Sequence, residues 1–251
     1  GHNGELTNFH SLRRRYEERG VIFTKSSDSE MFLAAYADTN HDALEERLVS
    51  AAQKLKGAFN IVGLTEDTLF AIRDPHGFKP LSVAKLNGGY LVASETCAFL
   101  DIEGAEWVGD VTPGSVITIN DKEGLKKVHY GKDPWKPCIF EHVYFARPDS
   151  HIAGRNVHLA RVEFGKQLWK EAPVDADIVV AIEDSGRSAA EGFSEASGLP
   201  LKRGYVRSHY IGRTFIRPTN ILRERGVSLK LSAIREVLNG KRVVIFDDSI
   251  V

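Results

Sequence analysis

The pattern of apolar and polar residues predicts three helices near the start of the chain, at residues 9–19, 26–36 and 41–56, and the third is amphipathic. In the third, Leu44, Leu48, Ala51 and Leu55 recur at intervals of four, three and four, as one buried helical face requires. Short apolar runs at 58–64, 69–73, 81–85, 90–94 and 115–119 are separated by turn signals and predict an antiparallel meander. Residues 2–8 are polar and rich in Asn and Gly, which predicts a turn.

The second half alternates between strand-like and helix-like segments. A helix is predicted over 153–172, with Val157, Ala160, Phe164 and Leu168 on one face, and further helices over 188–196 and 231–238. Strands are predicted over 177–182 and 204–207, and the run 243–246 has the composition of a short buried parallel strand. The polar stretch 120–136 is the predicted boundary, so we expect two domains, 1–135 and 136–251, with an α/β and α+β fold.

Asp247 and Asp248 follow the last predicted strand directly. Ligands of open α/β sheets bind beyond the carboxyl ends of the strands, where adjacent carboxylates accept hydrogen bonds from a vicinal diol such as a ribose 2′,3′-hydroxyl pair. The alternative is a local role, because Asp is favoured at corners where a strand enters a loop. The pattern alone leaves both open.

Ser185 and Gly186 lie in a loop between the predicted strand 177–182 and the predicted helix 188–196. The backbone N–H groups at such a helix N-terminus can hold an anion such as phosphate, although a plain strand-to-helix connection fits equally. The long basic and aromatic stretch 208–227 contains Tyr210 and Arg213. A loop of this length is typical of a functional lid or of a disordered segment, and its cations favour a lid.

Asn3 and Gly4 allow one further hypothesis near the start of the chain. An Asn amide and a neighbouring backbone N–H can converge on a carbonyl oxygen as the donors of an oxyanion hole. The other interpretation is a structural turn, which Asn-Gly pairs favour.

Charge and cysteine content restrict the possible partners and location. The formal net charge of −1 argues against a general nucleic-acid-binding protein, but residues 202–242 carry eleven Lys and Arg against two acids, Glu224 and Glu236. Such a region suits a small polyanion or is a solvated basic face. Two cysteines, Cys97 and Cys138, predict a reducing compartment and a cytoplasmic protein, and the short apolar runs predict neither a membrane span nor a signal peptide.

Residues 244–251 resemble the first part of the phosphoribosylpyrophosphate (PRPP) signature of type I phosphoribosyltransferases. Residues 138–150 resemble the segment that opens the transferase domain of glutamine PRPP amidotransferases, and residues 210–216 resemble the loop that closes over PRPP in that family. Residues 2–8, 27–30, 73–77 and 94–97 resemble its glutaminase domain. The combination of both halves distinguishes this family from other class II amidotransferases.

The resemblance implies a partial Ntn-type α/β/β/α glutaminase sandwich, followed by a partial type I phosphoribosyltransferase fold. It implies that Asn3 and Gly4 are the oxyanion donors and that Asp28 holds the α-amino group of glutamine. It further implies that residues around the second site bind PRPP, and that three of them help place a magnesium ion (Mg²⁺). The PRPP residues are Ser185, Gly186, Tyr210, Arg213, Asp247 and Asp248, and the magnesium ligands are Ser185, Asp247 and Asp248.

The nucleophile implied by the resemblance is an amino-terminal cysteine, and neither Cys97 nor Cys138 matches its position. The chain has no initial Met and ends before the expected 5′-phosphate loop, so we expect a fragment that catalyses neither half-reaction alone. Cys138 falls where some members of the family place a ligand of a 4Fe-4S iron–sulfur cluster. The alternative for Cys138 is a buried, inert thiol.

The implied activity of the whole enzyme is the first committed step of de novo purine synthesis. Glutamine, PRPP and water give 5-phosphoribosylamine, glutamate and pyrophosphate. The resemblance also implies a homotetramer inhibited by purine nucleotides. Two alternatives remain: a salvage phosphoribosyltransferase with an amidotransferase-like front domain, and a non-catalytic nucleotide-binding regulator.

Overall fold

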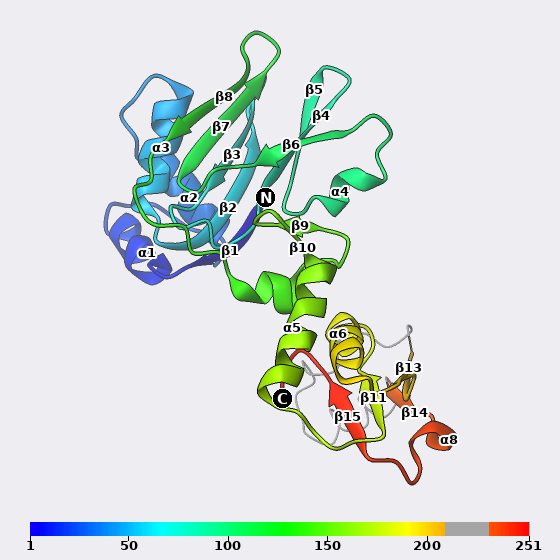
Figure 1. Ribbon diagram of the computed structural model, residues 1–251. Helices are drawn as coiled ribbons and strands as arrows, with labels where there is room; N and C mark the ends of the chain where they lie inside the picture. The colour runs from blue at the N-terminus through cyan, green and yellow to red at the C-terminus, as the bar shows by residue number, and fades with distance from the viewer. Residues whose placement is uncertain (209–230, 251) are drawn as a thin grey trace. The chain divides into compact units, whose positions relative to one another are not determined.

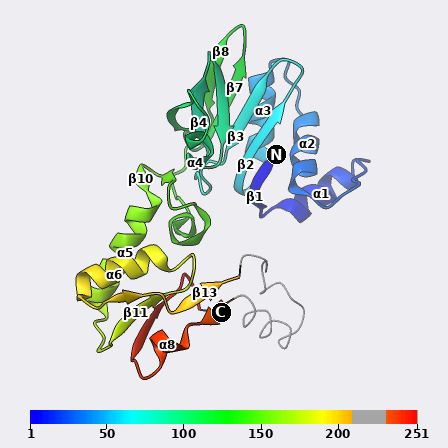
Figure 2. The same cartoon turned by 90° about the vertical axis from the view of Figure 1, so that its right-hand side faces the viewer.

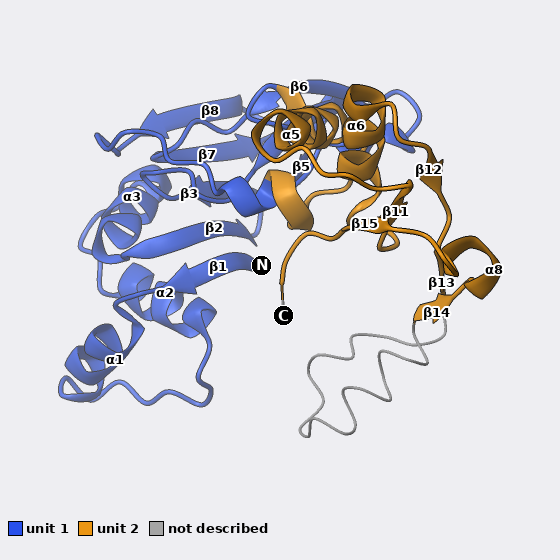
Figure 3. Ribbon diagram, turned by 60° about the horizontal axis from the view of Figure 1, so that its bottom comes forward, with its two compact units in different colours: residues 1–141, 150–154 blue, residues 142–149, 155–251 orange. Residues whose placement is uncertain are grey.

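The described part of this computed structural model is residues 1–208 and 231–250, and it forms two compact units (Figure 3). The first is Gly1–Glu141 with Ser150–Gly154, and the second is His142–Asp149 with Arg155–Val251. The first unit thus extends a few residues past the predicted boundary at 135. Backbone N–H groups of Lys136 and Cys138 donate to the carbonyls of His76 and Phe78, which attaches this segment to the first unit.

The first unit contains two antiparallel sheets (Figure 1). The larger has the order β1-β2-β3-β7-β8, formed by His2–Leu6, Gly57–Leu64, Leu69–Arg73, Ser115–Asn120 and Gly124–His129. The smaller has the order β5-β4-β6, formed by Gly89–Ala93, Ser82–Leu86 and Glu106–Asp110. The helices of this unit are α1, α2, α3 and the short α4, which are Phe9–Glu17, Asp28–Ala37, Leu44–Lys54 and Cys97–Leu100.

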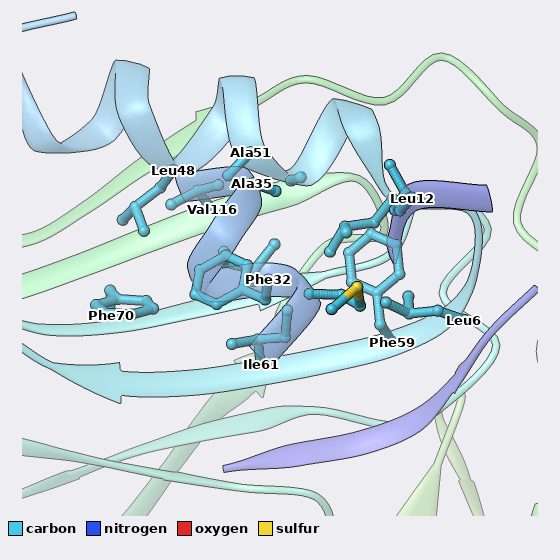
Figure 4. Packing of buried hydrophobic residues seen from close by; sticks show 14 of the residues in the cluster. Leu6, Leu12, Phe32, Ala35, Leu48, Ala51, Phe59, Ile61, Phe70 and Val116 are labelled. Carbon is cyan, nitrogen blue, oxygen red and sulfur yellow. The ribbon is translucent and has the colours of Figure 1, made fainter. Parts of the chain in front are cut away.

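Alternating residues of the larger sheet build two separate cores. Phe59 and Ile61 of β2 pack with residues of α1, α2 and α3 in one cluster (Figure 4). Ala71 and Ile117, which point to the opposite face, pack with Leu81 and Val83 against the smaller sheet. Because strand side chains alternate between faces, the order of layers is helices, larger sheet, smaller sheet, as Figure 2 shows.

Three predictions for this unit were wrong in part. Residues 2–8 were predicted to form a turn, but His2–Leu6 is an edge strand paired with β2. The predicted single meander is divided between two sheets, and the predicted boundary stretch contains β8. Polar edge strands such as β1 and β8 gain their stability from backbone pairing with a neighbour, so their own sequence carries little strand signal.

Asp38 connects the ends of three helices. Its carboxylate accepts hydrogen bonds from Arg19 at 2.6 Å and from Lys54 at 3.0 Å, and these two partners hold its pKa well below the usual value. Because the folded-state pKa is depressed, this pair stabilises the fold above the pKa of the unfolded chain. The stabilisation is lost as the pH falls towards the folded-state pKa.

We therefore expect Asp38→Asn to lower the free energy of unfolding by about 1 kcal/mol at neutral pH, a modest effect because solvent screens these charges. The difference from the unchanged protein should shrink once the pH falls below about 4. Urea unfolding of both proteins at several pH values measures this difference in the free energy of unfolding. A difference that is constant across this range would show that the ion pairs do not carry the effect.

The second unit is built on a three-stranded parallel sheet with the order β12-β11-β15, formed by Leu201–Lys202, Ile178–Ala181 and Val243–Phe246. Two longer helices, α5 and α6, cover Val157–Glu171 and Arg187–Ser197. The second unit also contains most of the π-helix Glu141–Phe145, the short strand β10 at Arg155–Asn156, the hairpin of β13 and β14 at Tyr205–Arg207 and Leu231–Ala233, and α8 at Arg235–Leu238. The short strand β9, His151–Ile152, belongs to the first unit.

The predicted last strand is parallel, as expected, but it is only partly buried. Phe246 packs in the core with Val179 and Phe193, whereas Ile245 is exposed. The predicted helix over 231–238 was half wrong, since Leu231–Ala233 pairs with β13 as a strand. Whether such a short segment forms a strand depends on pairing with a neighbouring strand rather than on its own pattern of apolar residues.

Helices α5 and α6 meet through glycines rather than through the predicted apolar face of α5. A Cβ atom on Gly165 would lie 1.9 Å from the carbonyl oxygen of Ala189, and one on Gly192 would lie 1.9 Å from that of Val162. Leu168, predicted to be buried, is exposed. The absence of side chains at the crossing lets the two backbones approach closely.

Gly192→Ala should therefore lower the free energy of unfolding of the second unit by about 3 kcal/mol, because the added methyl group must push one helix backbone from the other. A matched control is Gly198→Ala at the end of α6, where a Cβ meets nothing within 4 Å. That change should lower the stability by only about 1 kcal/mol, through its left-handed conformation alone. Equal thermal shifts for both variants would contradict the close-packing explanation.

Candidate active sites

The first candidate site lies on strand β1 at the edge of the larger sheet. Gly4 has a φ of +136°, and a Cβ atom there would lie 2.0 Å from the carbonyl oxygen of Ala58. Only glycine fits this position, so residue 4 can present backbone but no side chain. Among the described strands, β1 pairs only with β2, which leaves its other edge free.

Asp28 is the first residue of α2 and lies against the same strand. Its Oδ2 atom accepts a hydrogen bond from the backbone N–H of Leu6 at 2.9 Å. That N–H points away from β2, and because backbone direction repeats every two residues, the N–H of Gly4 emerges on the same free edge. The structure thus ties Asp28 to the strand that carries Asn3 and Gly4.

The side chain of Asn3 points to the face that is covered by the smaller sheet. Its Nδ2 atom donates to Ser94 Oγ at 3.4 Å, just after the end of β5. Ser94 lies in the stretch 94–97 that resembles the glutaminase domain, but no role was predicted for it. The contact joins residues 91 positions apart, and nothing in local sequence predicts it.

No arginine was predicted to bind the carboxylate of glutamine, and Arg73 does not fill that place. It is buried, and its guanidinium donates to the carbonyl oxygens of Lys79, Val111 and Gly77. Burial lowers its pKa. Arg73 therefore stabilises the loop after β3, together with the fully buried Asp74, which accepts backbone hydrogen bonds from residues of the same loop.

A pocket of about 280 Å³ opens on the helical side of this unit, and Asn3, Gly4 and Asp28 are not among its lining residues. It is lined by His2, Phe32, Tyr36, Phe70 and other residues, most of them apolar. Asn3 points to the other face of the sheet, so the pocket does not contain the predicted oxyanion donors.

The second candidate site lies at the carboxyl end of β15. Ser185 Oγ donates to Asp247 Oδ1 at 3.1 Å, and the backbone N–H of Asp248 donates to the same atom at 2.9 Å. Gly186 makes this approach possible, because a Cβ there would lie 2.1 Å from the carbonyl oxygen of Phe246. The loop that begins α6 and the acids after β15 therefore meet, as the sequence predicted.

The two acids differ in proton affinity. Burial, with Asp248 as a close neighbour, raises the pKa of Asp247. Burial opposes the shift at Asp248, but hydrogen bonds from Asp247, Ser185 and Ser249 lower its pKa. The lowered pKa of Asp248 favours its charged form, which can accept hydrogen bonds or bind a cation.

The oxygen donors at this site fit a magnesium ion shared with substrate phosphates. Magnesium in proteins uses one or two carboxylates and takes its other ligands from phosphates and water. In residues 1–208 and 231–250, no group of three or more His, Cys, Asp or Glu side chains is placed to hold a metal. The magnesium prediction therefore depends on Ser185, Asp247 and Asp248 acting together with a substrate.

Two cations near this site were not assigned a role from the sequence. Arg207 pairs with Asp184, next to Ser185, and Arg187 pairs with Glu183 and Glu191. Tyr210 and Arg213, the predicted lid residues, lie outside the described residues.

Both cysteines are free thiols. Cys97 is buried, and its thiol donates to Glu95 at 3.6 Å. Cys138 is half-buried rather than buried as one alternative required, because its segment runs along the surface of the first unit. The iron–sulfur cluster stays a prediction.

Comparison with known protein families finds a match in the first part of the chain. Residues 1–101 match the family described as the glutamine amidotransferase domain. No helix in the described part of the chain is long and apolar enough to cross a membrane.

The chain is similar to amidophosphoribosyltransferases along its whole length, and the resemblance stated from the sequence is confirmed. It is 48% identical over 252 residues to amidophosphoribosyltransferase 1, chloroplastic, of Arabidopsis thaliana, covering 100% of this chain and 44% of the relative. It is 44% identical over 251 residues to the Bacillus subtilis amidophosphoribosyltransferase, covering 100% of this chain and 52% of that relative. The chain spans about half the length of these curated relatives.

A solved structure is also similar to this chain. The glutamine PRPP amidotransferase of B. subtilis complexed with ADP and GMP matches with a TM-score of 0.91 at 44% identity. The match covers 100% of this chain and 55% of the other. The mixed α and β architecture is therefore shared.

Proposed function

We propose that the protein containing this chain is an amidophosphoribosyltransferase that catalyses the first step of purine synthesis. The observation that carries the proposal is the presence of two chemically different sites in one chain. The edge strand with Asn3, Gly4 and Asp28 suits a glutaminase, and the cluster of Ser185, Asp247 and Asp248 suits PRPP. In finer terms, the first unit corresponds to an Ntn-type glutaminase domain and the second to a type I phosphoribosyltransferase domain.

In the glutaminase reaction, Asp28 would hold the α-amino group of glutamine through Oδ1, since no described residue donates to that atom. The Asn3 amide and the Gly4 N–H would stabilise the oxyanion that forms when the amide carbonyl is attacked. In the family the nucleophile is an amino-terminal cysteine, and no residue of 1–251 is assigned to that role. The amide nitrogen would leave as ammonia when the glutamyl thioester forms, and water would then hydrolyse the thioester to release glutamate.

In the transferase reaction, ammonia attacks C1 of PRPP and pyrophosphate departs. Asp247 and Asp248 would hold the ribose hydroxyls, while the Ser185 hydroxyl and the backbone of Gly186 at the start of α6 would bind pyrophosphate. Arg213 and Tyr210 would close over the substrate. Magnesium, where bound, supplies positive charge to the departing pyrophosphate.

The regulatory and cellular proposals follow from the family. Purine nucleotides would inhibit the enzyme, and the B. subtilis structure that matches this chain was solved with ADP and GMP. A homotetramer and a cytoplasmic location are proposed as well, although the similar Arabidopsis proteins are named chloroplastic. An iron–sulfur cluster with Cys138 as one ligand is also proposed, and the visible absorption spectrum of the complete gene product tests it.

Pyrophosphate release by the complete gene product, supplied with PRPP, magnesium and one acceptor at a time, tests the proposal. Glutamine and free ammonia should both support release, and purine bases should not. Release with purine bases alone would establish a salvage phosphoribosyltransferase. Nucleotide binding without release for any acceptor would establish a regulator.

A further inference from the structure

Among the described residues, Ser94 is the one whose side chain forms a hydrogen bond with the side-chain amide of Asn3. Its hydroxyl oxygen accepts a hydrogen bond from Asn3 Nδ2 at 3.4 Å, at the long end of the normal range. Catalytic hydrogen bonds are often long in ligand-free structures and shorten when substrate binds. An amide nitrogen has two N–H groups, so Asn3 can donate one to Ser94 and the other to a substrate oxygen.

The loop that carries Ser94 is firmly anchored. Glu95 Oε2 accepts hydrogen bonds from Ser150 Oγ at 2.7 Å and from the Cys97 thiol, and Thr96 Oγ1 accepts one from the backbone N–H of His151 at 2.8 Å. Glu95, Thr96 and Cys97 follow Ser94 directly in the chain. The Ser94 hydroxyl is therefore presented from a fixed backbone rather than from a free loop.

Asn60 provides the reason why Asn3 needs such a partner. It lies directly opposite Asn3 in the β1–β2 register, so both side chains are on the same face of the sheet. Asn60 Nδ2 donates to the carbonyl oxygen of Pro80 at 2.6 Å, while its Oδ1 is buried and has no hydrogen-bond partner among the described residues. A buried acceptor of this kind attracts any nearby N–H, and here it would draw the Asn3 amide inward.

We infer that Ser94 is a positioning residue that keeps the Asn3 amide directed at the developing oxyanion rather than at Asn60. The inference rests on the proposed glutaminase function. Ser94 does not touch the reacting atoms, so it should affect the rate of the chemical step and leave glutamine binding through Asp28 unchanged. In terms of kinetics, kcat falls and KM stays the same.

The test is a double-mutant cycle on glutamine hydrolysis by the complete gene product. Ser94→Ala should lower kcat about tenfold, the factor for one lost positioning hydrogen bond, with KM unchanged. Ser94→Thr keeps the hydroxyl and should restore most of the rate. Ser94→Ala added to Asn3→Ala should lower kcat no further, because Ser94 acts only through Asn3.

Ser115→Ala is the matched control, since Ser115 is a buried serine of the same unit whose hydroxyl contacts His129 and not Asn3. It should leave kcat unchanged, and thermal unfolding of every variant checks that each is folded. If Ser94→Ala lowers kcat by the same factor in the unchanged protein and in the Asn3→Ala variant, or lowers it in neither, the positioning role of Ser94 is wrong. That result would leave the proposed glutaminase function in place. If Asn3→Ala itself leaves kcat unchanged, the proposed glutaminase site fails and the role of Ser94 fails with it.

Discussion

Replacing both Asp247 and Asp248 by Asn should reduce PRPP-dependent pyrophosphate release by about a thousandfold while basal glutamine hydrolysis is retained. Each carboxylate is expected to accept charge-assisted hydrogen bonds or to share a magnesium ion, and each such interaction is worth about 1.5–3 kcal/mol. An Asn side chain keeps the shape but removes the charge and replaces one acceptor with a donor. Separate assays of pyrophosphate and glutamate on the complete gene product measure the two activities.

Asp175 and Asp177 provide the matched control for this prediction. They lie at the opposite, amino end of the same sheet, where they form exposed ion pairs with Arg242. Changing both to Asn should leave pyrophosphate release within about twofold, because exposed ion pairs contribute little. If the change at Asp247 and Asp248 abolishes glutamine hydrolysis to the same extent, the assignment of these acids to PRPP is wrong.

Asn3→Ala should lower kcat for glutamine hydrolysis by about a hundredfold to a thousandfold, the usual effect of removing one oxyanion donor. Synthesis of phosphoribosylamine from free ammonia should be unaffected, because that reaction bypasses the first site. Steady-state kinetics with glutamine and with ammonia measure both rates.

Asn120→Ala is the control for Asn3→Ala. Asn120 lies in the same unit, but its side chain accepts the backbone N–H groups of Lys122 and Glu123 in a surface turn. Its replacement should leave both activities in place. An equal fall of the glutamine-dependent and ammonia-dependent rates with Asn3→Ala would contradict its role as an oxyanion donor.

Much of the fold could be predicted wherever one face of an element is buried. The helix predicted from Leu44, Leu48 and Ala51 is present, and these residues pack on the larger sheet. The same reasoning succeeded only in part for α5: Val157 is buried as predicted, but Leu168 is exposed. The contact of α5 with α6 depends on close backbone approach at Gly165, and glycine carries no hydrophobic signal that apolar periodicity could detect.

More of the second candidate site than of the first could be predicted from the sequence. Ser185 and Asp247 each follow a strand of one parallel sheet, and carboxyl ends of parallel strands meet at one edge, so their contact at 3.1 Å follows from the topology. Asn3 was predicted by resemblance, yet its strand was interpreted as a turn. The contact with Ser94 crosses from one sheet to the other, and such long-range contacts are set by tertiary packing alone.

The fate of the amide nitrogen of glutamine tests the central claim most directly. The complete gene product would be given PRPP, magnesium and glutamine that carries an isotope label in its amide nitrogen, and the nitrogen on C1 of the product would be analysed by mass spectrometry. Two sites acting in sequence predict labelled phosphoribosylamine, with one glutamate and one pyrophosphate formed for each molecule. Glutamate without labelled phosphoribosylamine, or phosphoribosyl transfer only to another acceptor, would contradict the account.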